Sequence, residues 1–66
     1  MINSLKVERA RHNMTQQDLA DRLNVSRQTI NAVEKGKFNP STILALKISL
    51  LFDLPVNDIF QLEDGD

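Results

Sequence analysis

Two short helices separated by only two residues are the feature that most restricts how this chain can fold. Thr15 is a good helix N-cap, and Asp18 three positions later completes a capping-box pattern. Ser26 is a second N-cap, and only Asn24 and Val25 lie between the two helical segments. Asn tolerates the left-handed conformation that ends a helix, so we expect Asn24 to end the first one. Helices joined by so short a turn must cross steeply, which is the arrangement of a helix-turn-helix.

Helical patterns also fill most of the remaining chain, and strand patterns are weak. Gly36 is placed to end the third helix in a left-handed conformation, and Asn39 or Ser41 is placed to cap the fourth. We therefore expect five helices, at about residues 4–12, 16–23, 26–35, 42–52 and 56–60. The sequence predicts one compact all-α domain over residues 1–62 and a polar, frayed acidic tail over residues 63–66.

The composition argues against several classes of site. The 66 residues include no cysteine and one histidine, so we expect no disulfide, no metal site and no bound cofactor. The longest apolar run, residues 48–52, contains Ser49 and is too short to cross a bilayer. The N-terminus lacks the basic-then-apolar pattern of a signal peptide. We therefore expect a cytoplasmic protein with no membrane partner.

Charge is divided unevenly along the chain. Residues 1–37 carry seven Lys or Arg and four acidic residues, a balance of +3, whereas residues 38–66 have a balance of −4. A basic half can hold an anionic partner even though the whole chain has a net charge of −1. The alternative interpretation is ordinary scatter of surface charge.

The third helix has one apolar side and one polar side. At about 100° per residue, Ile30 and Val33 lie together and must face the core. The opposite side contains Gln28, Asn31, Ala32 and Lys35 and is flanked by Arg27 and Thr29, so apart from Ala32 it is rich in donors and acceptors. Gln and Asn can pair with the edge of adenine, Arg with guanine, and Ala can touch the methyl group of thymine. The helix has the shape and chemistry to read duplex DNA, although any surface helix is polar on its outer side.

Taken together, these segments resemble a known family, the Cro/Xre-type helix-turn-helix transcriptional regulators. The resemblance is carried by MTQQDLADRLNVSRQTINAVEKGKFNPS (residues 14–41) and LALKISLLFDLPVNDIF (residues 44–60). It covers almost the whole chain and is greatest for short members, which are five-helix, lambda-repressor-like domains. The resemblance implies a sequence-specific regulator, usually a repressor and often a homodimer, whose partner is double-stranded DNA. It implies neither an enzyme nor a domain for a small-molecule effector.

The resemblance also implies roles for individual positions. The positions that would read bases are Arg27, Gln28, Thr29, Asn31 and Ala32. The positions that would contact the DNA backbone are Gln16, Gln17, Ser26, Lys35 and Lys37. Gln16 opens its helix, and a helix N-terminus suits a phosphate group. The two lysines have a second interpretation, because they also complement the negative C-terminal end of the third helix.

Arg9 and Glu34 occupy positions that can form an ion pair between the first and third helices of relatives. Arg9 shares a helix face with Leu5, and Glu34 lies nearer the core edge than Gln28 does. We therefore expect a structural ion pair here and not a DNA contact. The sequence departs from many relatives at Glu8, where they have an apolar residue, and this weakens the expected packing of the first helix.

The fourth helix has two apolar faces. One face contains Leu44, Ala45, Ile48, Leu51 and Phe52, and the opposite face contains Ile43, Leu46 and Leu50 at spacing i, i+3, i+7. An exposed apolar stripe on a small domain usually marks an interaction site. We expect Ile43, Leu46 and Leu50 to form a homodimer interface. The alternative is that residues 54–62 fold back over this stripe.

The leading hypothesis is a repressor that binds an inverted-repeat operator as a homodimer, with the third helix in the major groove. A close variant is an antitoxin-like or restriction-control regulator of its own operon. A different hypothesis is a protein-interaction module on a helix-turn-helix scaffold. The acidic charge balance and the surplus apolar stripe favour it, and the polar set of Gln16, Arg27, Gln28 and Asn31 disfavours it. A triad of Ser26, His12 and Asp21 is disfavoured, because triads are defined by geometry in a pocket and Ser26 is already explained as a cap.

Overall fold

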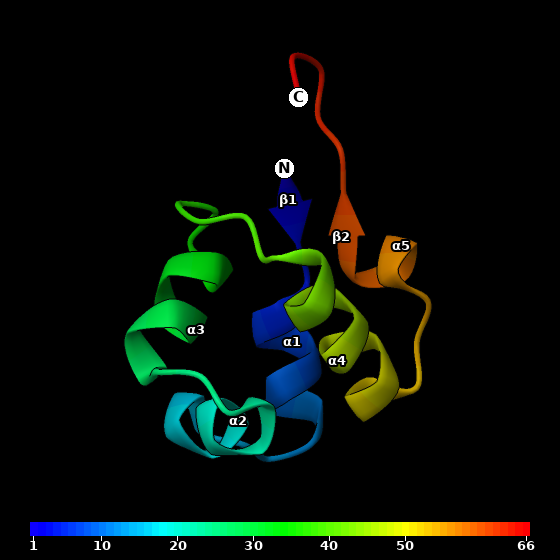
Figure 1. Ribbon diagram of the computed structural model, residues 1–66. Coiled ribbons are helices and arrows are strands. Elements are labelled where there is room, and N and C mark those ends of the chain that lie inside the picture. The colour runs from blue at the N-terminus through cyan, green and yellow to red at the C-terminus, as the bar shows by residue number, and fades with distance from the viewer.

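The computed structural model describes residues 1–66, and all five expected helices are present (Figure 1). In chain order the elements are β1 (Ile2–Asn3), α1 (Leu5–Arg11), α2 (Gln16–Leu23), α3 (Arg27–Glu34), α4 (Thr42–Phe52), α5 (Val56–Ile59) and β2 (Phe60–Gln61). The helical boundaries agree with the expected ones to within one residue. None of the five helices is long and apolar enough to cross a lipid bilayer.

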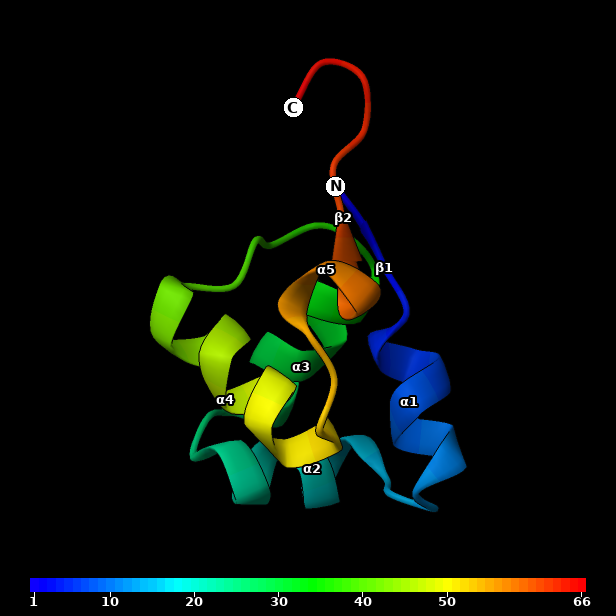
Figure 2. The same ribbon diagram turned by 90° about the vertical axis from the view of Figure 1, so that its right-hand side faces the viewer.

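One hydrophobic core joins the helices. α2 packs against α3 and α4, and α3 packs against α1. Each helix contributes its apolar side, and the buried residues are Leu5, Leu19, Ala20, Leu23, Ile30, Val33, Leu44, Ile48, Phe52, Ile59 and Phe60. α2 lies at the end of the molecule opposite both termini, and α3 runs from α2 toward β1 (Figures 1 and 2).

Side-chain caps fix where the helices begin. Thr15 and Asp18 form the expected capping box, in which the backbone N–H of each residue donates to the side chain of the other at 3.0 Å. Ser26 caps α3 by accepting the Thr29 N–H at 3.1 Å. Ser41, and not Asn39, caps α4. These caps satisfy backbone donors that a helix leaves free in its first turn.

Left-handed residues fix where α2 and α3 end. Asn24 has a φ of 59° and ends α2, as the sequence predicts. Gly36 has a φ of 73° directly after the C-cap of α3. Both residue types adopt this conformation at low cost. The turn between α2 and α3 is therefore short and rigidly specified, which sets the angle between the two helices.

A two-residue strand pair is the feature that the sequence does not predict. β1 and β2 pair antiparallel, with Ile2 opposite Gln61 and Asn3 opposite Phe60. Strands of two residues are too short to produce an alternating pattern, and their pairing depends on the folded core bringing the two chain ends together. The Asn3 side chain extends this contact inward, because its Nδ2 donates to the Val33 carbonyl oxygen at 2.9 Å.

The acidic tail, expected to be frayed, has polar partners in the structure. The amino group of Met1 lies 3.0 Å from a Glu63 carboxylate oxygen and 2.8 Å from one of Asp66. The Glu63 N–H also donates to Asp66 at 2.7 Å. The hydrogen bond from Met1 lowers the pKa of the Asp66 carboxyl, and the same contact raises the pKa of the Met1 amino group. Glu63 and Asp66 lie in an exposed tail, so the contacts contribute little to stability.

Candidate nucleic-acid interface

α3 exposes a polar side at the end of the molecule where it meets α2. Ile30 and Val33 are fully buried on its inner side. Of the residues expected to read bases, Arg27 and Gln28 are exposed, whereas Thr29, Asn31 and Ala32 are half-buried. The first turn of α3 therefore presents Arg27 and Gln28 to any partner that approaches this side.

Ser26 and Thr29 are tied to each other at the start of α3. Their hydroxyl oxygens lie 2.9 Å apart, in addition to the cap bond between the Thr29 N–H and Ser26. Each hydroxyl oxygen keeps capacity for a further hydrogen bond. These two side chains can contact a ligand while continuing to hold the N-terminus of α3 in place.

Gln16, the first residue of α2, reaches across to α3. Its side-chain Nε2 donates to Asn31 Oδ1 at 3.2 Å and to Glu34 Oε1 at 3.0 Å. This cross-helix contact was not predicted, because sequence spacing does not show which outward side chains of two different helices meet. It places Gln16 and Asn31 together on the side of the molecule that also carries Arg27 and Gln28.

Arg9 and Glu34 form a two-bond ion pair behind this contact. Arg9 Nε donates to Glu34 Oε2 at 2.8 Å, and Arg9 Nη2 donates to Glu34 Oε1 at 3.3 Å. Arg9 Nη1 also donates to the Met14 carbonyl oxygen at 2.9 Å. The side chains are 15% and 4% exposed, respectively, so water screens the pair poorly. The hydrogen bonds with the Glu34 carboxylate raise the pKa of Arg9 above its ordinary value.

The remaining backbone-contact candidates lie at the two ends of this surface. Gln17 is exposed on the first turn of α2, where its Nε2 donates to Asp21 at 2.8 Å. Lys35 and Lys37 are exposed just after α3 and take part in none of the ion pairs in the structure. Both lysines are thus free to meet phosphate groups. They also lie at the C-terminal end of α3, so the structure is compatible with both of their interpretations.

The apolar stripe of α4 is open to solvent. Ile43, Leu46 and Leu50 are 69%, 54% and 82% exposed. The alternative in which residues 54–62 cover the stripe is therefore wrong. The C-terminal segment packs elsewhere, because Ile59 and Phe60 enter the core and β2 pairs with β1.

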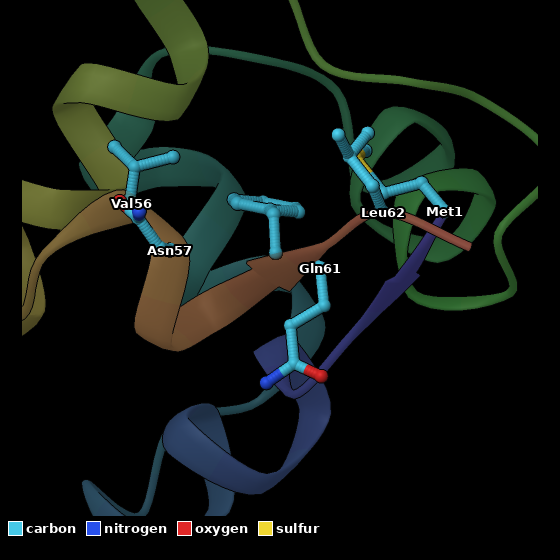
Figure 3. A pocket seen from close by; sticks show the side chains of 6 residues that line it. Met1, Val56, Asn57, Gln61 and Leu62 are labelled. Atoms are coloured by element: carbon cyan, nitrogen blue, oxygen red, sulfur yellow. The ribbon is translucent and has the colours of Figure 1, made fainter. Parts of the chain in front are cut away.

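One open apolar hollow adjoins this stripe, and a second one adjoins the first. One, of about 290 Å³, is lined in part by Leu46, Ala45, Val56 and Phe60. The other, of about 480 Å³, shares Val56 and Phe60 and extends to Met1 and Leu62 (Figure 3). The apolar surface of α4 thus continues across α5 toward the chain ends.

The residues considered for a catalytic triad, His12 and Ser26 among them, have structural contacts. His12 packs its ring against Phe52, with 5.0 Å between ring centroids, and its Nδ1 lies 2.9 Å from the Glu8 carbonyl oxygen. Ser26 caps α3.

Glu8 is buried and paired with Arg11 at 2.8 Å, which explains how α1 accommodates a charged residue at a position that is often apolar in relatives. No group of three or more metal-ligating side chains is gathered in the structure.

Comparison with known proteins agrees with this architecture. A helix-turn-helix family model matches residues 5–59. An uncharacterized HTH-type transcriptional regulator of Methanocaldococcus jannaschii is 56% identical over 66 residues, covering 100% of both chains. One from Archaeoglobus fulgidus is 47% identical, covering 100% of this chain and 93% of that one, and one from Bacillus subtilis is 44% identical, covering 97% of each.

A solved structure shares the same arrangement of helices. The restriction-modification controller protein C.AhdI from Aeromonas hydrophila superposes with a TM-score of 0.75 at 27% sequence identity, over 85% of each chain. The family match, the relatives and this structure all indicate a helix-turn-helix protein. The capped α2–α3 pair and the exposed polar side of α3 indicate the same. The chain belongs to the helix-turn-helix family of DNA-binding transcriptional regulators, which are not enzymes.

Proposed function

We propose that this protein is a repressor that binds an inverted-repeat operator as a homodimer, with α3 in the major groove. The observation that carries the proposal is the exposure of Arg27 and Gln28 on the first turn of a helix whose opposite side is fixed in the core. A recognition helix contacts base edges through its N-terminal residues. Repression then requires only that the protein occupy the operator and block polymerase in the cytoplasm.

The exposed face divides into base-reading and backbone-contacting residues. Arg27 and Gln28 are the exposed members of this set, and they pair with guanine and adenine, respectively. Thr29, Asn31 and Ala32, which are half-buried, contact neighbouring bases. The DNA backbone is contacted by Gln16, Gln17, Ser26, Lys35 and Lys37. Phosphate contacts fix the register of the protein on the duplex but carry no sequence information.

The stripe of Ile43, Leu46 and Leu50 forms the homodimer interface. A contiguous apolar surface on a small domain marks an interaction site. A second copy is the occupant that the DNA-binding role favours, because a twofold dimer places two recognition helices about 34 Å apart, one turn of DNA. The hollow beside Leu46, lined by Val56 and Phe60, provides a place where an apolar side chain of the partner copy fits.

A regulator that controls its own operon is a specific form of this proposal. The structural similarity to the controller protein C.AhdI favours it, since that protein is named for control of a restriction-modification system. A protein-interaction module on this scaffold is the competing function, and it requires that α3 select no DNA sequence.

Selection from a random duplex library tests DNA reading directly. The purified protein is incubated with the library at near-physiological salt, and the bound duplexes are sequenced. We expect an inverted repeat with half-sites about one turn apart. A single half-site would contradict the symmetric dimer alone. Weak binding without enrichment, lost as salt rises, would indicate non-specific electrostatics and would contradict the proposed function.

Light scattering with two matched variants tests the dimer. Leu46→Glu places a charge in the stripe, and Val7→Glu makes the same change at another exposed apolar residue, on α1. We expect Leu46→Glu to be monomeric at concentrations where the wild type and Val7→Glu are dimeric. If Leu46→Glu remains as dimeric as the wild type, the stripe is not the interface.

A further inference from the structure

The hydrogen bonds among Arg9, Glu34, Gln16 and Asn31 determine which atoms two amide side chains present to a partner. Side-chain amides have a donating nitrogen and an accepting oxygen that look alike in shape, so their orientation is decided by their partners. Glu34 is a carboxylate and can only accept hydrogen bonds. Any side-chain atom that forms a hydrogen bond with the Glu34 carboxylate must therefore be a donor.

Glu34 sets the orientation of Gln16. Gln16 Nε2 lies 3.0 Å from Glu34 Oε1, and the reverse orientation would bring two acceptor oxygens to that distance. The Glu34 side chain is itself held by two bonds from the Arg9 guanidinium, so it has no freedom to turn away. The amide nitrogen of Gln16 must therefore point inward.

Gln16 in turn sets the orientation of Asn31. The same Nε2 donates to Asn31 at 3.2 Å, so the Asn31 atom at that place must be the oxygen Oδ1. Asn31 Nδ2 has no partner within the chain. No buried side-chain nitrogen or oxygen lacks a hydrogen-bond partner, and Nδ2 is therefore accessible to solvent. Asn31 consequently presents a hydrogen-bond donor outward, with its acceptor turned inward.

We propose that Arg9 and Glu34 are positioning residues for DNA reading, because they fix Asn31 as a donor toward the base that it contacts. This inference rests on the proposed function. A fixed donor matches N7 of either purine, O6 of guanine or O4 of thymine. It mismatches the exocyclic amino groups of cytosine and adenine. A bidentate contact with adenine requires both Asn31 atoms to face outward, so it is disfavoured at this position.

The test compares base preferences of three variants with those of the wild type, each by selection from the same random duplex library. Glu34→Gln keeps the size of the side chain but provides both a donor and an acceptor, so Gln16 and Asn31 can reverse. Glu8→Gln is the matched control, because Glu8 is also buried in an arginine ion pair at 2.8 Å, but its partner is Arg11 of the same helix. Asn31→Asp provides only acceptors, which reverses what this position offers.

We expect Glu34→Gln to reduce the preference for guanine or thymine over cytosine at one position of each half-site by about three- to tenfold, the range of one hydrogen bond. Glu8→Gln should leave that preference unchanged. Asn31→Asp should shift the preference at the same position from guanine or thymine toward cytosine, which offers only its N4 amino donor in the major groove. Thermal unfolding of each variant detects a loss of fold. NMR spectra of the side-chain amides detect a change in the orientation of Gln16 and Asn31.

Three outcomes would overturn the proposal. If Glu34→Gln folds and keeps the wild-type preference at every position, the ion pair does not act on base reading. If Asn31→Asp changes no position, Asn31 does not contact a base. If Glu8→Gln relaxes the same position as Glu34→Gln, the effect is one of general stability. Absence of any enrichment with the wild type would instead contradict the proposed function itself.

Discussion

α3 and α4 are similar on their buried sides and differ on their exposed sides. Both are anchored by fully or almost fully buried aliphatic residues, Ile30 and Val33 in one and Ile48 in the other. Outward, α3 presents Arg27 and Gln28, whereas α4 presents Leu46 and Leu50. The exposed sides therefore suit partners of different chemistry. The polar side matches base edges and phosphates, and the apolar side matches another apolar protein surface.

The two exposed sides also differ in how firmly they are ordered. Part of the α3 surface is held by hydrogen bonds, between Ser26 and Thr29 and from Gln16 to Asn31 and Glu34. The α4 stripe has no such ties, since aliphatic side chains cannot make them. A surface that discriminates between bases needs fixed donors and acceptors. A dimer surface can instead acquire its order when the partner copy packs against it.

The largest expected effect on stability is the difference between substitutions on the buried side and on the exposed side of α4. Ile48→Ala leaves a cavity in the core and should cost about 2–5 kcal/mol. A core of this size supplies only about 3–5 kcal/mol, so we expect the variant to be largely unfolded by circular dichroism. Leu50→Ala should change the unfolding free energy of the monomer by less than about 0.5 kcal/mol. Equal losses in chemical denaturation would show that the stripe is covered.

The next effect concerns the ion pair behind α3. Glu34→Ala leaves the Arg9 guanidinium mostly buried without its partner, and it also removes an acceptor from Gln16. We expect a loss of about 3 kcal/mol in unfolding free energy, at the low end for a buried pair because Arg9 keeps some exposure. Urea denaturation measures it. A loss below about 1 kcal/mol would place this pair among ordinary surface ion pairs.

A smaller effect distinguishes base reading from phosphate contact on α3. Arg27→Ala should cost about 1–3 kcal/mol of preference for the selected duplex over a scrambled one. Lys37→Ala should weaken binding to both duplexes about equally and reduce the slope of log affinity against log salt by about 1. Fluorescence anisotropy across a salt series measures both. If Arg27→Ala weakens the two duplexes equally, Arg27 does not read a base.

The sequence predicts the helical framework well because its signals are local. The capping box of Thr15 and Asp18, the left-handed Asn24 and the Ser26 cap each act within four residues, and each is present in the structure. The choice between Asn39 and Ser41 stayed open because both are good caps, and only the path of the chain decides it in favour of Ser41.

Contacts between residues far apart in the sequence could not be predicted from local signals. The β1–β2 pair and the hydrogen bond from Asn3 to Val33 join residues 30 or more positions apart and leave no periodic pattern. The Arg9–Glu34 contact is present, but its expectation came from the family resemblance and not from spacing. Which base each residue on α3 reads, and whether Ile43, Leu46 and Leu50 meet a second copy, stay predictions, because both depend on a partner.

The smallest expected effect is the acid dependence of the α2 cap. The Thr15 N–H and hydroxyl lower the pKa of Asp18 below its ordinary value of 3.8. Because the folded-state pKa is the lower one, the cap contributes stability above the unfolded-state pKa, and this contribution is lost as pH falls through the folded-state pKa. We expect Asp18→Asn to lower the melting temperature at about pH 6 and to converge on the wild type as pH falls well below 3.8. Asp64→Asn, at an exposed carboxylate without a hydrogen bond, is the control. A constant difference between Asp18→Asn and the wild type across this pH range would show that the charge of Asp18 does not stabilise the start of α2.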